Sequence, residues 1–175
     1  MSALIIPFLE IQSDENKMRE IGEIFFESST KKDFKDENER ELFYEKYLGY
    51  YLKHFPELAF IAFDQKVLGY IVAAPDSLDP GLAHLQPHLS VFKDYFNNYP
   101  AHLHINCHHE SRGRGVGGLL IGELEKKLKS LNIKGLHIMT GTDSLNRKFY
   151  QKSGFDFEAT ESFRDSSILF MGKTL

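Results

Sequence analysis

The sequence predicts a mixed α/β (α+β) fold, in which a twisted central sheet of about seven strands is flanked by about four helices. Short apolar runs of strand length alternate along the chain with longer segments whose apolar residues recur at helical spacing. One apolar run, residues 101–107, leads through a glycine-rich turn at residues 111–118 into a helical pattern. The chain shows no internal repeat, low-complexity tract or linker, so we expect one domain over residues 1–175.

The N-terminal segments predict one strand followed by two helices. Residues 4–9 are apolar, and Pro7 restricts that strand to an edge or an end of the sheet. Ser13 is a suitable N-cap for a helix over residues 14–28. A second helix over residues 39–54 carries its aromatic side chains on one side, which is typical of a core-facing helix.

The middle of the chain predicts a strand pair followed by a long loop. Residues 57–63 and 67–74 are strand-like and close enough for a hairpin. Residues 75–100 hold four of the six prolines and show no clear period, so we expect a loop there, with a short helix at residues 88–96. The strand at residues 101–107 follows.

The C-terminal segments predict a regular succession of elements. A helix over residues 115–131, ended at Asn132, follows the glycine-rich turn, and its leucines share one face. A strand at residues 134–140 and a helix at 144–153 come next. The last two segments, residues 155–163 and 167–172, are expected to form an antiparallel pair.

Composition and charge exclude several classes of function. The formal net charge of −4 lacks the basic footprint of a general nucleic-acid-binding protein, so we expect no nucleic-acid partner. No apolar run approaches the ~20 residues of a membrane span, and the start of the sequence shows no secretion signal. A single cysteine, Cys107, excludes an intrachain disulfide and suits a reducing compartment. We therefore expect a cytoplasmic protein without a membrane partner.

The glycine-rich turn is the most informative stretch of the chain. Arg112, Gly115 and Gly117 fit the pattern Arg/Gln-x-x-Gly-x-Gly/Ala. Glycines let the backbone approach a ligand closely, and the N–H groups at the start of a helix point toward an anion, so the pattern indicates a phosphate or pyrophosphate site. The glycine order does not fit a dinucleotide-binding turn, and no Gly-Lys-Ser/Thr marks a nucleotide-triphosphate loop.

A second motif follows the turn. Phe149 and Tyr150 are followed, after three further residues, by Gly154 and Phe155. This motif resembles the second signature of the GNAT superfamily of N-acetyltransferases, and the glycine-rich turn resembles the first. The two signatures stand in the family's order, about 35 residues apart and with a strand pattern between them.

The resemblance extends to one subgroup and covers most of the chain. Residues 54–62, 68–76 and 99–105 are similar to the acetyltransferase-like domain at the C-terminus of protein O-GlcNAcases, and to its free-standing bacterial relatives. The subgroup often carries an acidic residue where this chain has Asn106, and the family often has Asn where this chain has Asp143.

The resemblance implies a GNAT fold whose fourth and fifth strands splay to admit acetyl-CoA as co-substrate. It implies direct transfer of an acetyl group to a primary amine of a small molecule, without a covalent enzyme intermediate, by a monomer or a homodimer. The alternative is a catalytically impaired GNAT-like module that binds acetyl-CoA or another protein, which Asn106 favours. The cofactor contacts that the resemblance implies are Cys107, His109, Arg112, Gly113, Arg114, Gly115, Val116, Gly117, Gly118, Asn146 and Phe149.

The catalytic groups that we expect are Tyr150, His104 and Asn106. The tyrosine at the position of Tyr150 points at the coenzyme sulfur in the family, and a phenol with a reference pKa of about 10 can protonate a departing thiolate. His104 is our first choice of base, because it stands on a strand and can be neutral near pH 7. Asn106 can orient an amine or a water. His108, His109 and, through a water chain, Glu110 remain alternatives.

The histidines also raise the possibility of a metal site. Eight histidines occur, and His102, His104, His108 and His109 could bring imidazoles together. No acidic partner stands at ligand spacing in the sequence nearby, so we expect no metal. We expect most of these histidines to lie in a cleft or on the surface.

Overall fold

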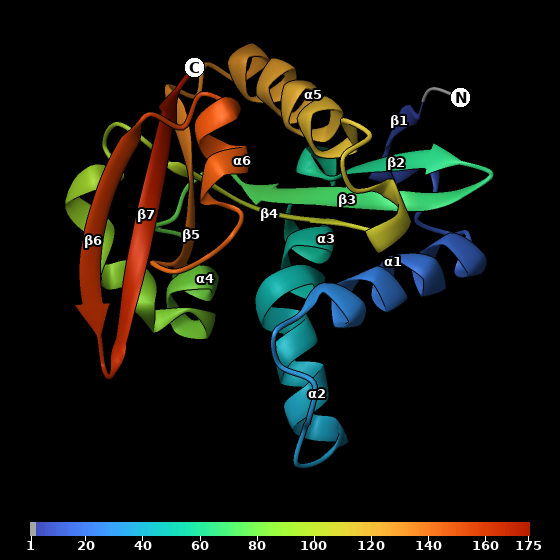
Figure 1. Cartoon of the computed structure of the whole chain (residues 1–175), viewed down its shortest axis with the longest axis horizontal. Helices are drawn as coiled ribbons and strands as arrows, with labels where there is room; N and C mark the ends of the chain where they lie inside the picture. Colours follow the sequence, from blue (N-terminus) through green and yellow to red (C-terminus); the bar gives the residue numbers. More distant parts are fainter. Residues whose placement is uncertain (1–2) are drawn as a thin grey trace. The chain divides into compact units, whose positions relative to one another are not determined.

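The computed structural model describes residues 3–175, which fall into two compact units (Figure 1). The described part of the first unit comprises residues 3–73 and His104–Lys127, and the second unit comprises Ala74–Leu103 and Leu128–Leu175. Over the described residues, the strands follow the order β1-β2-β3-β4-β5-β7-β6 in a seven-stranded mixed sheet. The mixed sheet predicted from the sequence is confirmed.

The first unit contains an antiparallel meander. Strand β1 (Leu4–Pro7) pairs with β2 (Phe60–Asp64), which pairs with β3 (Lys66–Ala74). Gln65 joins β2 to β3 with φ = +61°, the left-handed conformation of a tight turn. The sequence-based prediction begins β2 too early, because Pro56–Leu58 form a 3₁₀ turn.

Helix α1 (Glu15–Ser28) covers part of the core of this unit. Its N-cap is Asp14, whose carboxylate accepts the N–H of Lys17 at 3.1 Å, so the prediction of Ser13 as N-cap is wrong by one residue. A carboxylate at this position satisfies an open N–H group and also interacts favourably with the helix dipole. The helix buries Ile21, Ile24 and Phe25.

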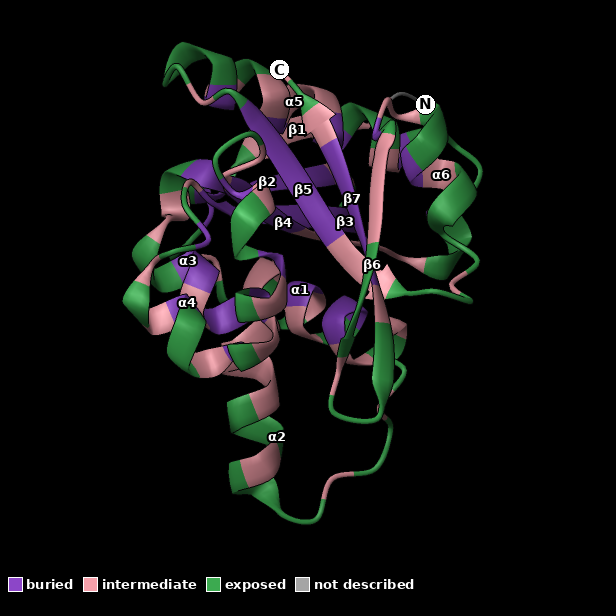
Figure 2. Ribbon diagram, turned by 90° about the vertical axis from the view of Figure 1, so that its left-hand side faces the viewer, coloured by how far each residue is buried: buried purple, intermediate pink, exposed green. Residues whose placement is uncertain are grey.

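The single helix predicted for residues 39–54 consists of three consecutive pieces. Helix α2 (Glu37–Tyr44) is capped by Asp36, a π-helical segment covers Glu45–Gly49, and helix α3 (Tyr50–His54) completes the run. Helix α2 carries no buried residue, as its exposed and half-buried surface in Figure 2 shows.

The second unit is built around β5 (Gly135–Gly141), β7 (Ser166–Thr174) and β6 (Phe157–Phe163), which pair antiparallel in that order. The centres of β5 and β7 are buried, whereas the edge strand β6 is half-buried in part and exposed in part (Figure 2). The first residues of β4 (Ala101–Cys107) pair parallel with β5 at two positions, Ala101 with Leu136 and His102 with His137. Such short parallel pairing agrees with the predicted splay of the fourth and fifth strands.

The helices are more numerous than predicted. Residues 3–175 form six α-helices instead of about four, because the run at residues 37–54 is divided and α4 (Pro80–Leu85) lies within the predicted loop. Asp79 caps α4, and Pro80 occupies its first turn, so a proline that suggested a loop begins a helix instead. Helix α6 (Arg147–Lys152) is shorter than predicted.

Helix α5 (Val116–Ser130) agrees with the prediction to within a residue at each end. Leu120, Leu124 and Leu128 are buried, whereas Leu131, which was assigned to the same face, is 46% exposed. The helix has ended before Leu131, and Asn132 adopts φ = +57°. No helix among residues 3–175 is both long enough and apolar enough to cross a membrane.

His137 lies in the aromatic core of the second unit. Its ring stacks on Phe96, His102 and Phe170, with centroid distances of 5.1, 5.0 and 4.5 Å. Its Nδ1–H donates to the carbonyl oxygen of Tyr99 at 2.7 Å. Burial lowers the pKa of His137 to about 3, so the ring is neutral in the folded protein. His102 and His137 are therefore core residues, whereas the other six histidines are half-buried or exposed, as expected for most of them.

The buried neutral His137 predicts a loss of stability in mild acid. Below about pH 6.5 the unfolded chain binds a proton that the folded His137 excludes, so the free energy of unfolding falls by up to about 1.4 kcal/mol per pH unit. His137→Asn keeps a donor for the carbonyl of Tyr99 and should remove the uptake of one proton on unfolding, so the pH dependence of the free energy of unfolding becomes weaker. His84→Asn, at an exposed position, should leave that pH dependence unchanged. Denaturant unfolding between pH 7 and pH 5 measures the slopes. Equal slopes for wild type and His137→Asn would contradict the prediction.

Candidate functional site

The turn between β4 and α5 has the geometry of an anion site. A 3₁₀ turn at His109–Ser111 is followed by two glycines in the left-handed region, Gly113 at φ = +75° and Gly115 at φ = +79°. A Cβ placed on either glycine would meet no atom within 4 Å. The positive φ angles favour glycine at both positions. The absence of nearby atoms shows that the space beside the turn is open.

Ser111 fixes this turn to β3. Its side chain is 1% exposed, and its Oγ lies 2.8 Å from the carbonyl oxygens of both Leu68 and His108. The N–H of His108 also donates to the carbonyl of Leu68 at 2.9 Å. The sequence analysis missed Ser111, because a serine before a glycine-rich turn carries no signal of burial. The turn consequently has a rigid base.

The start of α5 supplies the groups that an anion needs. The N–H of Leu119 donates to the carbonyl of Gly115 at 3.1 Å, which is the first bond of the helix. The N–H groups of Val116, Gly117 and Gly118 precede that bond and, like those of any first helical turn, have no helical acceptor. Together with the helix dipole they favour a bound phosphate.

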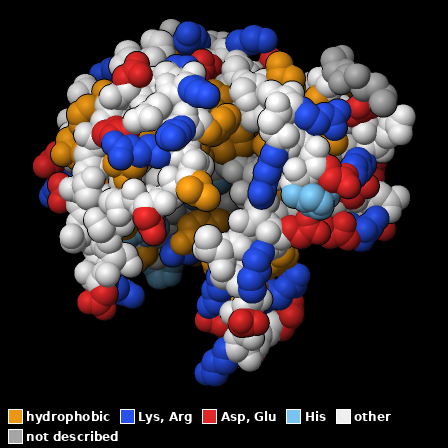
Figure 3. Space-filling model, viewed as in Figure 1, with side chains coloured by type: hydrophobic (Ala, Val, Ile, Leu, Met, Phe, Trp, Pro, Cys, Tyr) orange, Lys and Arg blue, Asp and Glu red, His pale blue; other side chains and the backbone are white. Residues whose placement is uncertain are grey.

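Two arginines add positive charge to the same turn. Arg112 and Arg114 are both exposed, one on each side of Gly113. Over α2, by contrast, Figure 3 shows Lys and Arg side chains among Asp and Glu. The local pair of guanidinium groups therefore complements the N–H groups of α5 as an anion-binding feature.

Strand β4 approaches β3 closely just before the turn. A Cβ on Gly69 would lie 2.8 Å from the carbonyl oxygen of Asn106 and 3.0 Å from Sγ of Cys107. The Asn106 side chain donates from Nδ2 to the hydroxyl of Tyr70 at 2.7 Å. Tyr70 is completely buried, and burial raises its pKa well above the usual range, so its hydroxyl stays neutral. Asn106 is thus held in one orientation, with its amide oxygen able to accept a further bond.

Cys107 is a half-buried thiol at the end of β4. Burial raises its pKa to about 11, although the guanidinium of Arg112 acts in the opposite direction. The thiolate is the reactive form of cysteine, so Cys107 is a poor nucleophile at neutral pH.

His104 lies against two tyrosines in the first unit. Its ring centroid is 5.4 Å from that of Tyr47 and 5.1 Å from that of Tyr51, and both ring pairs are nearly perpendicular. Tyr47 belongs to the π-helical segment and Tyr51 to α3. The aromatic side predicted for this helix therefore contacts the histidine that the sequence suggested as a base.

Glu110 is engaged with a lysine. Its carboxylate pairs with Nζ of Lys66 at 2.6 Å, and this hydrogen bond lowers the pKa of Glu110. A carboxylate with a lowered pKa is a weaker proton acceptor, which makes Glu110 a poorer alternative base than the sequence suggests.

His108 and His109 lie near a carboxylate that is distant in sequence. Their ring centroids are 4.2 Å apart, and Nδ1 of His109 is 4.0 Å from Oε2 of Glu27 at the end of α1. The potential ligand atoms of these three residues lie within 4.8 Å of one another. The expectation that no acidic partner accompanies the histidines is therefore wrong, because it considered only neighbours in sequence.

The remaining predicted residues belong to the second unit. Tyr150 is 7% exposed, and its ring contacts those of Phe149 and Phe155 at centroid distances of 5.1 and 5.5 Å. Asn146 occupies the N-cap position of α6, where its Oδ1 accepts the hydroxyl of Ser144 at 2.6 Å. The second motif thus positions Tyr150 by packing against the rings of Phe149 and Phe155.

Comparison with known proteins places these features in a family. A family model described as "Acetyltransferase (GNAT) family" matches residues 18–155. The chain is similar in structure to SsHAT, with 18% identity, 99% of this chain and 98% of that chain covered, and a TM-score of 0.74. It is also similar to the apo form of an agmatine N-acetyltransferase mutant (14% identity, 100% and 100% covered, TM-score 0.70). A third similar chain comes from the NatC complex bound to Gag peptide and CoA. Its identity is 16%, the match covers 100% of this chain and 99% of that chain, and the TM-score is 0.65. No curated protein matches the chain.

Proposed function

We propose, because this chain belongs to the acetyltransferase (GNAT) family, that it moves an acetyl group from acetyl-CoA to the primary amine of a small molecule. The observation that carries the proposal is the turn at Gly113–Gly118, where left-handed glycines precede the open N–H groups of α5. Such a turn suits the pyrophosphate of a coenzyme A. The CoA in the similar NatC complex supports the same cofactor.

The proposed cofactor site follows from these groups. Arg112 and Arg114 contribute charge, and the main chain at Cys107 and His109 would follow the pantetheine arm. We also assign Asn146 and Phe149 to the cofactor, as the resemblance of the second motif implies. We include no metal and no covalent intermediate in the proposal, and the raised pKa of the Cys107 thiol supports a direct transfer.

The proposed reaction needs one proton acceptor and one proton donor. The amine nitrogen attacks the thioester carbonyl, the carbon–sulfur bond breaks, and the products are an amide and a free thiol. His104 takes the proton of the attacking amine, and Tyr150 protonates the departing thiolate. Backbone N–H groups at the end of β4 polarise the carbonyl oxygen, and Asn106 orients the amine.

The acceptor and the setting are also part of the proposal. The net charge of −4 suits a cationic amine better than a nucleic acid. The name of the similar agmatine N-acetyltransferase also indicates an amine acceptor for that protein. We further propose a single-domain protein of the O-GlcNAcase-like subgroup that acts in the cytoplasm as a monomer or homodimer, without a membrane partner.

Asn106 favours a second candidate, a module that binds acetyl-CoA or a protein without catalysis. Its Nδ2 donates to the Tyr70 hydroxyl, and a side-chain amide cannot accept a proton usefully. Release of free thiol from acetyl-CoA with a panel of primary amines separates the two candidates, because only an enzyme accelerates it.

The cofactor site predicts a stabilising effect of acetyl-CoA. A ligand that binds only the folded state at 100 times its Kd stabilises it by about 2.7 kcal/mol, so acetyl-CoA should raise the melting temperature. Gly115→Asp should abolish the shift by placing a negative charge beside the phosphates. Gly115→Asn adds a side chain of the same size without the charge, so it should keep part of the shift in melting temperature. A full shift in Gly115→Asp would show that the turn does not hold the phosphates.

The assignment of Tyr150 predicts a loss of rate without a loss of binding. Tyr150→Phe removes one hydroxyl and keeps the packing against Phe149 and Phe155, so kcat should fall by roughly 10²–10⁴-fold while the Kd of acetyl-CoA stays the same. Tyr95→Phe, in the same unit, serves as the control. An unchanged kcat where chemistry limits the rate would leave Tyr150 with a packing role only.

The assignment of His104 predicts a pH dependence. A histidine base must be neutral, so activity should rise with pH through a single ionisation in the histidine range. His104→Ala should remove this limb of the profile of kcat/KM, and His84→Ala should keep it. The assignment fails if His104→Ala retains both rate and profile, since the amine would then arrive neutral or lose its proton to water.

A further inference from the structure

The π-helical segment Glu45–Gly49 is an unusual feature of the first unit. The N–H of Tyr50 donates to the carbonyl of Glu45, five residues earlier, instead of closing an α-helical turn. Single π turns are energetically unfavourable within α-helices and often occur at functional sites. Neither the fold nor the proposed reaction accounts for this one.

The segment places a carboxylate against the helix backbone. Gly49 has ordinary helical geometry, with φ = −58°, so its conformation does not require glycine. A Cβ at Gly49 would collide with Oε2 of Glu45 and lie 2.9 Å from Cε1 of Tyr44. The absence of a side chain at Gly49 therefore makes room for the Glu45 carboxylate beside the ring of Tyr44.

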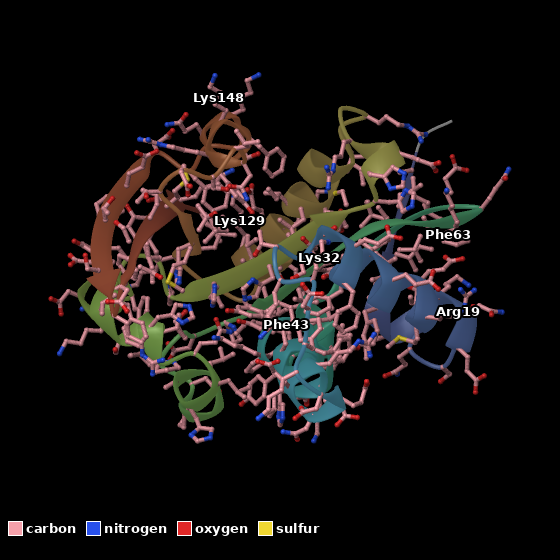
Figure 4. The ribbon with its side chains drawn as sticks, turned by 60° about the horizontal axis from the view of Figure 1, so that its bottom comes forward. Arg19, Lys32, Phe43, Phe63, Lys129 and Lys148 are labelled. Carbon is pink, nitrogen blue, oxygen red and sulfur yellow. The ribbon has the colours of Figure 1, made fainter. Side chains whose placement is uncertain are left out.

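The surroundings of this carboxylate are aromatic. The ring of Tyr44 contacts Phe25 and Phe26 of α1, with centroid distances of 5.5 and 6.2 Å. Phe43, which Figure 4 labels on α2, contacts Tyr47 at 5.0 Å, and Tyr47 in turn contacts His104. Aromatic faces of this kind attract cations.

The helical segment that carries Glu45 contacts β4 through Tyr47, whose ring centroid lies 5.4 Å from that of His104. Burial raises the pKa of Tyr44, and the neighbouring Glu45 charge raises it further. Tyr44 contributes to the raised pKa of Tyr70. The hydroxyl of Tyr70 accepts the side-chain N–H of Asn106 at 2.7 Å. The carboxylate therefore belongs to the same region of the first unit as Asn106, which we assign to the acceptor amine.

None of the ion pairs within residues 3–175 includes the Glu45 carboxylate, and Nζ of the adjacent Lys46 lies over the ring of Tyr47, 4.9 Å from its centroid. Two acidic residues of α2 are paired, Glu37 with Arg40 and Glu39 with Lys31. Glu45 is half-buried, and a partly desolvated charge is costly unless a partner neutralises it. A cationic ligand would supply that partner.

We propose that Glu45 and the ring of Tyr44 bind a positively charged group of the acceptor that does not react. The inference rests on the proposed acetyl transfer and names its substrate class as diamines. The attacking nitrogen must be neutral, whereas a carboxylate stabilises the protonated form of a neighbouring amine. Glu45 therefore suits the second, distal ammonium, while the first amine is presented near Asn106 and His104.

Steady-state kinetics with paired acceptors tests the proposal. The probes are the diamines from 1,3-diaminopropane to 1,6-diaminohexane, each compared with the monoamine of the same chain length. Glu45→Gln should raise KM for the preferred diamine roughly 10–100-fold, the usual effect of losing a charge-assisted hydrogen bond, with kcat changed less than about threefold. KM for the monoamine should not change.

Two further variants separate position from charge. Gly49→Ala leaves the Glu45 carboxyl group intact but displaces it, so it should raise KM for the diamine in the same direction. Glu41→Gln removes an exposed carboxylate one turn earlier on the same helix and should leave both KM values unchanged. Melting curves confirm that each variant is folded.

The outcomes distinguish the proposal from the reaction on which it rests. An equal rise in KM for diamines and monoamines, or a fall in kcat for both, would overturn the anchoring role of Glu45. If wild type turns over no amine, the proposed reaction fails, and calorimetric binding of the diamine series then decides the anchor. If diamines bind wild type and Glu45→Gln abolishes that binding, the site is supported. If diamines bind neither wild type nor Glu45→Gln, or bind both equally, the site is overturned.

Discussion

The close approach of β3 and β4 at Gly69 is the constraint on which the candidate site depends. Only a residue without a side chain lets the backbone of Asn106 and Cys107 come so near to β3. Because of this approach, the carbonyl of Leu68 is within reach of both the His108 N–H and the Ser111 hydroxyl. The glycine-rich turn is therefore attached to a sheet strand at its base, while its glycines leave the space beside the backbone open. A rigid base with an open backbone is what a phosphate site needs.

The same strand end relates the cofactor turn to the side chains expected to serve the acceptor. Asn106 is oriented by the buried hydroxyl of Tyr70, and His104 is oriented by the rings of Tyr47 and Tyr51. The two tyrosines that hold His104 come from the π-helical segment and from α3, so the irregular helix determines the surroundings of β4. In this account β3 and β4 position the cofactor through backbone groups, while the helical run at residues 37–54 selects the acceptor through its side chains.

The parts of the site that the sequence predicts are those whose chemistry is local. The glycines of the turn and the strand and helix on either side can be recognised from spacing alone, and α5 begins within a residue of its prediction. The π-helical segment could not be predicted, because the need for Gly49 arises from a carboxylate folded back along the helix. The pairing of Glu27 with His109 joins residues far apart in sequence, and the burial of His137 depends on rings from several segments. Such tertiary contacts leave no periodic signal.

The central claim is that the backbone of the turn between β4 and α5 holds the phosphates of acetyl-CoA. Proton–nitrogen NMR spectra recorded during a titration with acetyl-CoA test it most directly, because each N–H group reports on its own environment. The account predicts saturable shifts for the N–H signals of residues 113–118, with those of the edge strand β6 unchanged. Saturable binding of acetyl-CoA that leaves the signals of residues 113–118 unmoved would contradict the account.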